Sequence, residues 1–147
     1  MTIRIRLGAS DWLWPSWETR FYPADMPEEW RLAFYSSQYA CVFLAQDKWR
    51  SASVGEMSQW CDDVHSQFRF LLADGENSTV PDALGHKAIL LGIDDPRLVW
   101  FNRNSDLKEL AARIRLLPAD EECFLVSSDD DLGQLEKVAT LLELMDR

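Results

Sequence analysis

Ile5-Arg6-Leu7-Gly8-Ala9-Ser10-Asp11-Trp12 is the stretch of this 147-residue chain that decides its fold. Apolar residues alternate with arginines up to Gly8, and this alternation predicts a first β-strand. The strand leads into a loop rich in aromatic residues, among them Trp14, Trp17, Phe21 and Tyr22. Such rings could stack on a flat or sugar-like ligand, or they could pack beneath the first helix.

Buried-strand patterns alternate with one-sided helix patterns along the rest of the chain. Strands are expected over residues 41–45, 68–73, 88–93, 98–101 and 123–126, and helices over about 25–39 and from near residues 53, 105 and 131. Ser53 and Glu56 have the spacing of a capping box, and Trp30, Ala33 and Phe34 should face the core. Repeated alternation of this kind forms right-handed βαβ units, so we expect an α/β fold with a mostly parallel sheet of about 5–6 strands and about 4 helices.

Two of these expected strands, 88–93 and 98–101, lie unusually close together in the sequence. Only Asp94, Asp95, Pro96 and Arg97 separate them. Parallel neighbours need a crossover of a dozen or more residues. We therefore expect either a hairpin or one true strand beside an irregular segment.

Composition restricts the class of protein. A chain of this length fits one domain, residues 1–147. The formal charge of −10 opposes binding to nucleic acid, whose phosphates attract Lys and Arg. No apolar run approaches the roughly 20 residues of a membrane span, and the N-terminus lacks a secretion signal, so no membrane partner and a cytoplasmic location are expected. Cys41, Cys61 and Cys123 are odd in number and widely spaced, which predicts buried thiols.

The N-terminal motif resembles the start of the DUF72 (YecE-like) family. That start is a strand leading to Gly-Thr-Ser-Gly-Trp, then a second Trp and Phe-Tyr-Pro; here the matching residues are Gly8 to Trp12, Trp17 and Phe21-Tyr22-Pro23. The resemblance implies a TIM-like (β/α) barrel of uncertain biochemical role. Because a full barrel takes about 250 residues, the resemblance implies a shortened member with a truncated or incomplete TIM-like barrel.

Several polar residues of that family have no counterpart in this chain. Its Glu-x-Asn pattern at the second strand is replaced by Phe43 and Ala45, and the Lys-containing end of its third strand is replaced by an acidic one at Asp74. A late Asn-Asn pair becomes Ser127 and Ser128, with the following Asp129 retained. With these departures, the resemblance implies a degenerate member of the family with a weakened family site.

The carboxyl ends of parallel strands are where ligands bind in such folds. This rule, with the aromatic loop, nominates as ligand-binding residues Ser10, Asp11, Trp12, Trp17, Tyr22, Gln46, Asp74, Asn102, Arg103 and Ser127. Asp47, Lys48 and Asp129 are the candidates for acid and base chemistry. Asp129, Asp130 and Asp131 favour capping of the last helix over a metal site. His65 and His86 have no triad or zinc pattern, and no cofactor is indicated.

Three functions follow from these residues. The leading hypothesis is a non-catalytic binding or interaction domain that keeps the aromatic loop but not the family's polar set. One alternative is a small-molecule enzyme such as a hydrolase, with its site at the carboxyl strand ends. Another is a structural homodimer, in which a second copy covers the sheet edges left open by the missing strands.

Overall fold

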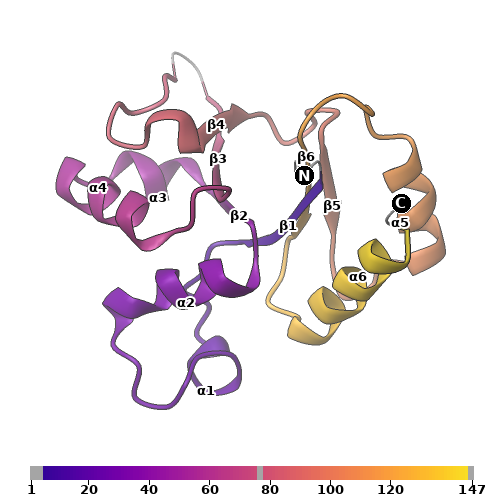
Figure 1. Ribbon diagram of the computed structural model, residues 1–147, viewed down its shortest axis with the longest axis horizontal. Coiled ribbons are helices and arrows are strands. Elements are labelled where there is room, and N and C mark those ends of the chain that lie inside the picture. The colour runs from indigo at the N-terminus through magenta and orange to yellow at the C-terminus, as the bar shows by residue number, and fades with distance from the viewer. Residues whose placement is uncertain (1–4, 76–77, 146–147) are drawn as a thin grey trace.

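A single curled β-sheet organises the chain (Figure 1). The computed structural model describes residues 5–75 and 78–145. The sheet has six strands in the order β4-β3-β2-β1-β6-β5, and every neighbouring pair is parallel. The strands are β1 (Ile5–Ser10), β2 (Cys41–Leu44), β3 (Arg69–Ala73), β4 (Ala88–Leu91), β5 (Leu98–Phe101) and β6 (Cys123–Ser127). The fold is α/β, an all-parallel half barrel consistent with an incomplete TIM-like barrel.

Helices flank the sheet on its outer side, with α1–α4 beside the N-terminal strands and α5 and α6 beside β5 and β6 (Figure 1). They are α1 (Trp17–Arg20), α2 (Arg31–Gln38), α3 (Gln46–Arg50), α4 (Val54–Asp63), α5 (Leu107–Arg115) and α6 (Leu132–Met145), with 3-10 turns η1 (Glu28–Trp30) and η2 (Gly85–Lys87). The predicted capping box is present at the start of α4, where Glu56 N donates to Ser53 Oγ and Ser53 N donates to Glu56 Oε1. In the part of the chain that the structure describes, no helix combines the length and apolar composition that crossing a membrane requires.

Both sequence-based expectations for this region were wrong: β4 and β5 do not form a hairpin, and both segments are true strands of the sheet. They lie at opposite edges of the sheet, joined by residues 92–97. In a flat sheet those edges would be roughly 24 Å apart, and the connection must also return along a strand length. A stretch this short reaches at most about 25 Å. The sheet therefore has to curl until its edges approach each other.

Alternate residues of each strand belong to two separate hydrophobic clusters, as the two-residue period of a strand requires. Val42 and Leu44 of β2 belong to the larger cluster, which includes Ile114 and Val138 of the helices. Cys41 and Phe43 belong to a smaller cluster, formed by strand residues on the inside of the curl. Leu91 and Leu98, from the two edges, both contribute to this inner cluster.

An ionic cluster around the buried side chain of Arg6 lies at the amino ends of the strands. Arg6 is 1% exposed, and its Nη1 lies 3.0 Å from Glu122 Oε1. Arg69 Nε lies 3.3 Å from the same oxygen, and Arg6 Nε donates to the carbonyl of Gln67 at 2.8 Å. Burial lowers the pKa of Arg6, an effect that the carboxylate of Glu122 opposes. Arg6 is paired with Phe124 of the inner cluster, so it lies on the inner side of the curled sheet.

The helix expected over residues 25–39 starts later than predicted. Residues 28–30 form η1, and α2 begins only at Arg31. Within α2, the buried face follows the i, i+3, i+4 spacing from Leu32 and not from Trp30. Leu32, Tyr35 and Ser36 are buried, whereas Trp30 is 61% exposed. The prediction that Trp30 and Ala33 face the core was wrong.

Candidate functional site

An open cavity of about 750 Å³ lies at the carboxyl ends of the strands, at the mouth of the half barrel. Its lining comes from the ends of β1 and β2, from α3, from β5 and from the residue after β6. The lining residues are Ser10, Asp11, Leu13, Trp14, Pro15, Phe43, Ala45, Asp47, Lys48, Ser51, Trp100 and Ser128. We call this space the mouth cavity.

Aromatic rings make up much of the wall of the mouth cavity. Phe43 and Trp100 meet edge to face with ring centroids 4.9 Å apart. The Trp100 indole is held in place because its Nε1 donates to the carbonyl of Ile93 at 3.0 Å. Trp14 lines the cavity from the loop after β1. Phe43 stands at the position where the resemblance implies a glutamate. The same substitution therefore removes a carboxylate and adds an aromatic ring to the cavity wall.

Lys48 is the cation of the mouth cavity, and α3 sets its position. Its Nζ lies 3.8 Å from Asp11 Oδ1 and 4.6 Å from the centroid of the Trp12 ring. The ammonium is therefore held between a carboxylate and an aromatic face. Asp47, its neighbour in α3, is exposed, and its carboxylate makes no hydrogen bond or ion pair with any residue described by the structure. Asp47 is the acid of this cavity that is free to meet a ligand.

Asp11 has a backbone conformation that L-residues rarely adopt, with φ = 77°. Its Oδ1 accepts hydrogen bonds from Trp12 N at 2.6 Å and Leu13 N at 3.1 Å, so the side chain supports its own turn. In the motif that this stretch resembles, a glycine stands at this place, and glycine adopts positive φ without steric cost. The turn carries the chain from β1 into the wall of the mouth cavity.

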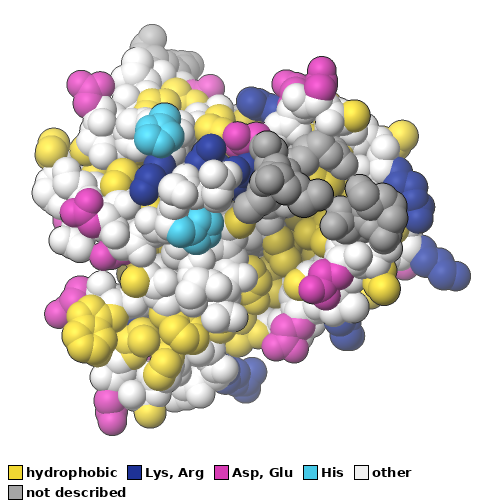
Figure 2. All heavy atoms as spheres, viewed as in Figure 1, with side chains coloured by type: hydrophobic (Ala, Val, Ile, Leu, Met, Phe, Trp, Pro, Cys, Tyr) yellow, Lys and Arg dark blue, Asp and Glu magenta, His cyan; other side chains and the backbone are white. Residues whose placement is uncertain are grey.

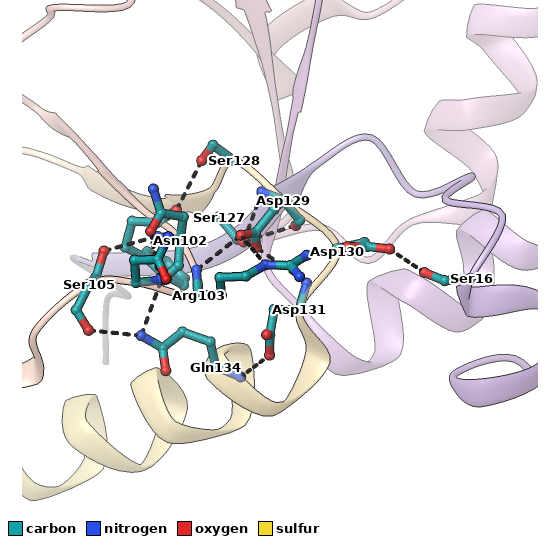
Figure 3. Close-up of polar contacts among 12 residues, drawn as sticks. Ser16, Asn102, Arg103, Ser105, Ser127, Ser128, Asp129, Asp130, Asp131 and Gln134 are labelled. Atoms are coloured by element: carbon teal, nitrogen blue, oxygen red, sulfur yellow. Dashed lines mark hydrogen bonds and ion pairs between the residues drawn. The ribbon is translucent and has the colours of Figure 1, made fainter.

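Asp129 does not line the mouth cavity, although its position in the sequence made it an acid-base candidate. It belongs to a network that also contains Asn102, Arg103 and Ser127 (Figure 3). Asp129 Oδ2 accepts from Arg103 N at 2.9 Å and from Arg103 Nε at 3.2 Å. Burial alone would raise the pKa of Asp129, but hydrogen bonds from the backbone of Arg103 and Asp131, the Arg103 guanidinium and Ser127 outweigh it and lower the pKa. These contacts join the ends of β5 and β6.

Asp130 and Asp131, which follow Asp129, make contacts with other elements (Figure 3). Asp131 Oδ1 accepts from Gln134 N at 2.8 Å, which confirms the predicted capping of the last helix. Asp130 accepts from Ser16 Oγ at 2.5 Å and from Arg103 Nη2 at 3.0 Å, and its carbonyl accepts from Trp17 Nε1 at 3.0 Å. Asp130 thus connects the end of β6 to the segment after β1 through Ser16 and Trp17.

The other nominated residues lie away from the mouth cavity. Trp12, Trp17 and Tyr22 are buried, at 4%, 0% and 4% exposure, and belong to the main core. The side chain of Gln46 lies against Gly75, and Asp74 is exposed with its backbone N donating to Leu91 O. Ser10, Asp11, Asp47 and Lys48 are the nominated residues that meet in the cavity. Trp14 of the aromatic loop lines it too. So do Phe43, Trp100 and Ser128, which sequence reasoning did not nominate.

A second cavity, of about 430 Å³, adjoins the first. It lies between η1 with α2 on one side and α4 on the other, and we call it the side cleft. Its lining residues are Trp12, Leu13, Glu28, Glu29, Leu32, Lys48, Ser51, Ala52, Glu56, Gln59, Trp60 and Asp63. Trp12 and Trp60 meet edge to face here, with centroids 5.4 Å apart. Leu13, Lys48 and Ser51 line both cavities, so the two spaces meet at these residues.

The two histidines lie at the opposite end of the sheet from the mouth cavity. His65 and His86 precede β3 and β4, and Figure 2 shows both on one face, near basic side chains. Burial lowers the pKa of His65, as do the charges of Lys87, Arg6 and Arg69. Within residues 5–75 and 78–145, no group of three or more His, Cys, Asp and Glu residues is arranged to hold a metal ion.

Comparison with known proteins supports one relationship. The family described as "Protein of unknown function DUF72" matches residues 6–73, a little under half of the chain. This segment contains β1, β2 and β3, the turn at Asp11 and α3 with Asp47 and Lys48. No curated protein and no solved structure matches the sequence. Over residues 6–73, the chain is therefore similar to the DUF72 family.

Proposed function

We propose that this protein binds a small ligand in the mouth cavity without carrying out a reaction on it. The observation that carries the proposal is the combination of the aromatic wall, Trp14, Phe43 and Trp100, with the free carboxylate of Asp47. Ligand sites are typically concave and mostly apolar, with a few polar groups that fix orientation. Their usual position in parallel βα folds is the carboxyl end of the strands, where this cavity lies.

The non-catalytic part of the proposal is supported by how the reactive side chains are engaged. Ser10 Oγ donates to the carbonyl of Ser127 at 3.1 Å, so its proton points to a backbone acceptor and not to a base. Asp129, the candidate acid or base, is held in the Arg103 network outside the cavity. An activated nucleophile needs a base within hydrogen-bond reach, and the described lining residues provide no such pair for Ser10.

The test follows the indole N–H signals of the seven tryptophans by nuclear magnetic resonance. Methyl glucoside, octanediamine and benzoate serve as neutral, cationic and anionic probes. We expect at least one probe to shift the Trp14 and Trp100 signals saturably. The signal of Trp17, which is fully buried, is the internal reference.

Trp100→Leu should abolish the saturable shift because it removes a cavity wall. Trp30→Leu should leave it unchanged, since Trp30 is exposed and lines neither cavity. The absence of a saturable shift with all three probes at high millimolar concentration would contradict the proposal. Turnover of a nitrophenyl ester by the wild type that is lost in Asp47→Asn would contradict its non-catalytic part.

A further inference from the structure

The mouth cavity and the side cleft are neighbouring parts of one groove. Leu13, Lys48 and Ser51 line both of them. A ligand longer than the mouth cavity can therefore pass Lys48 and continue into the side cleft. Apolar surface follows this path, from Trp100 and Phe43 in the mouth to Leu32 and Trp60 in the cleft. The shape suits an elongated ligand with an apolar middle.

The charges along the groove are strongly unbalanced. Its carboxylates are Asp11 and Asp47 in the mouth and Glu28, Glu29, Glu56 and Asp63 in the cleft, whereas Lys48 is the one cation among the described lining residues. Asp11 is paired with Lys48, and Glu56 caps α4. The carboxylates of Asp47, Glu28 and Glu29 make no side-chain contact with a described hydrogen-bond or ion-pair partner. Free acids therefore lie in both parts of the groove.

Lys48 shows how this groove accommodates an alkylammonium group. Its Nζ lies over the Trp12 ring at 4.6 Å and 3.8 Å from a carboxylate oxygen of Asp11. Both contacts are the ones that an ammonium ligand would seek. Because this ammonium stands where the two cavities meet, a cationic ligand should present an uncharged segment there and place its charges on either side.

From these observations we infer that the ligand class is an elongated aliphatic diamine: one ammonium lies beside Asp47 in the mouth, the alkyl chain passes Lys48, and the other ammonium lies beside Glu28 and Glu29 in the side cleft. The inference rests on the proposed function, since it needs the mouth cavity to be a binding site, and extends it by a ligand class and a second cavity.

The experiment compares three probes of equal length that carry two, one and no charges: octanediamine, aminooctanol and octanediol. Affinities for the full chain are measured by isothermal titration at low and physiological salt. We expect octanediamine to bind roughly five-fold tighter than aminooctanol, the gain of one partly exposed ion pair. The difference should shrink at higher salt because exposed charges are screened.

Three variants locate the two ends of the ligand. Asp47→Asn and the double variant Glu28→Gln/Glu29→Gln should each reduce octanediamine binding roughly five-fold, to the level of aminooctanol. Lys48→Met should strengthen octanediamine binding by roughly two- to five-fold, because it removes the like charge at the junction. Asp120→Asn is the matched control, an exposed carboxylate that lines neither cavity and precedes β6.

The outcomes separate this inference from the proposed function. Equal affinity for octanediamine and octanediol would overturn the inference that the ligand is a diamine. Weaker octanediamine binding by Lys48→Met than by the wild type would overturn it too. If methyl glucoside or benzoate still shifts the Trp14 and Trp100 signals in that case, the mouth cavity remains a ligand site with another ligand class. If no probe binds, both proposals fail together. If Asp47→Asn weakens octanediamine binding but Glu28→Gln/Glu29→Gln does not, the arrangement of one ligand across two cavities is wrong.

Discussion

Asp11 carries the strained turn between β1 and the mouth cavity, with φ = 77°. Asp11→Ala should destabilise the protein by about 1–2 kcal/mol, because alanine bears the steric cost of positive φ without the hydrogen bonds to Trp12 N and Leu13 N. Asp11→Gly loses the same hydrogen bonds, but glycine adopts positive φ without steric cost. This variant should therefore be at least about 1 kcal/mol more stable than Asp11→Ala. Urea unfolding followed by tryptophan fluorescence measures both. Equal stabilities would show that the backbone conformation costs nothing.

The three thiols should differ sharply in reactivity. Cys41 and Cys123 are buried, and burial raises the pKa of Cys41, so neither should react with a thiol-specific chromogenic reagent in the native state. Cys61 is partly exposed; its pKa is raised by burial, so it should react first but slowly. In denaturant all three thiols should react. Rapid native modification of two or more thiols would contradict the burial of Cys41 or of Cys123.

At the scale of single residues, the strand-end rule predicted Ser10, Asp11, Asp47 and Lys48, because parallel strands bring their carboxyl ends to one edge. Trp100 could not be predicted in this way. It lies within a strand, and period-two alternation does not say which face points into the curl until the neighbouring strands are placed. For most rings of the aromatic loop, the packing alternative holds: Trp17 is buried and packs against Tyr35 of α2, with ring centroids 6.2 Å apart.

At the scale of the secondary structure elements, Asp129 joins the ends of β5 and β6. This contact makes the stability of the fold depend on pH. The native pKa of Asp129 is lowered, although burial opposes the shift, because hydrogen bonds from Arg103, Asp131 and Ser127 favour the carboxylate. A lowered native pKa means that the proton binds more weakly to the folded chain. The stabilisation is therefore complete above about pH 4 and is lost as the pH falls through the native pKa.

Asp129→Asn tests this directly. Thermal unfolding of wild type and variant should show a smaller loss of stability for Asp129→Asn between about pH 4 and about pH 2. Asp120→Asn, which alters an exposed carboxylate in a turn, is the control and should follow the wild type. Parallel pH profiles for Asp129→Asn and wild type would assign the acid sensitivity to other groups.

Most elements could be predicted because their signals are local. The helices α4, α5 and α6 follow the i, i+3, i+4 spacing, and Ser53 and Asp106 act as caps at predicted starts. The short helices α1 and α3 were not predicted, since four or five residues are too few for a periodic pattern. The direction of β5 could not be predicted from its neighbour in the sequence alone. Six connecting residues suggest a hairpin with β4, and only the strand order of the whole sheet shows that β5 is parallel.

At the scale of the whole molecule, the ionic cluster at the amino ends of the strands depends on Arg6. Arg6→Met should destabilise the protein by about 2–3 kcal/mol, below the usual cost of breaking a buried ion pair because Glu122 is one-third exposed. The loss arises because Glu122 and the carbonyl of Gln67 lose a donor. Arg20→Met, at an exposed position of α1, should cost less than about 0.5 kcal/mol. Equal effects in guanidinium unfolding would mean that the cluster contributes no stability.

The homodimer expected from open sheet edges stays a prediction. β4 and β5 each pair with a strand on one side only. Light scattering at micromolar concentration tests it, and a monomer there would rule out a structural dimer. Such a result would leave the binding proposals untouched, because every residue of the mouth cavity and the side cleft comes from one chain.

The six-residue connection between β4 and β5 also shows where a half barrel of this kind could accept further strands. The strands it joins do not pair with each other, so extra βα units inserted between Leu91 and Leu98 would disturb no existing ladder. Every other crossover in the sheet links strands that are already in register. This connection is thus the place at which whole βα units could be inserted without breaking a strand pairing.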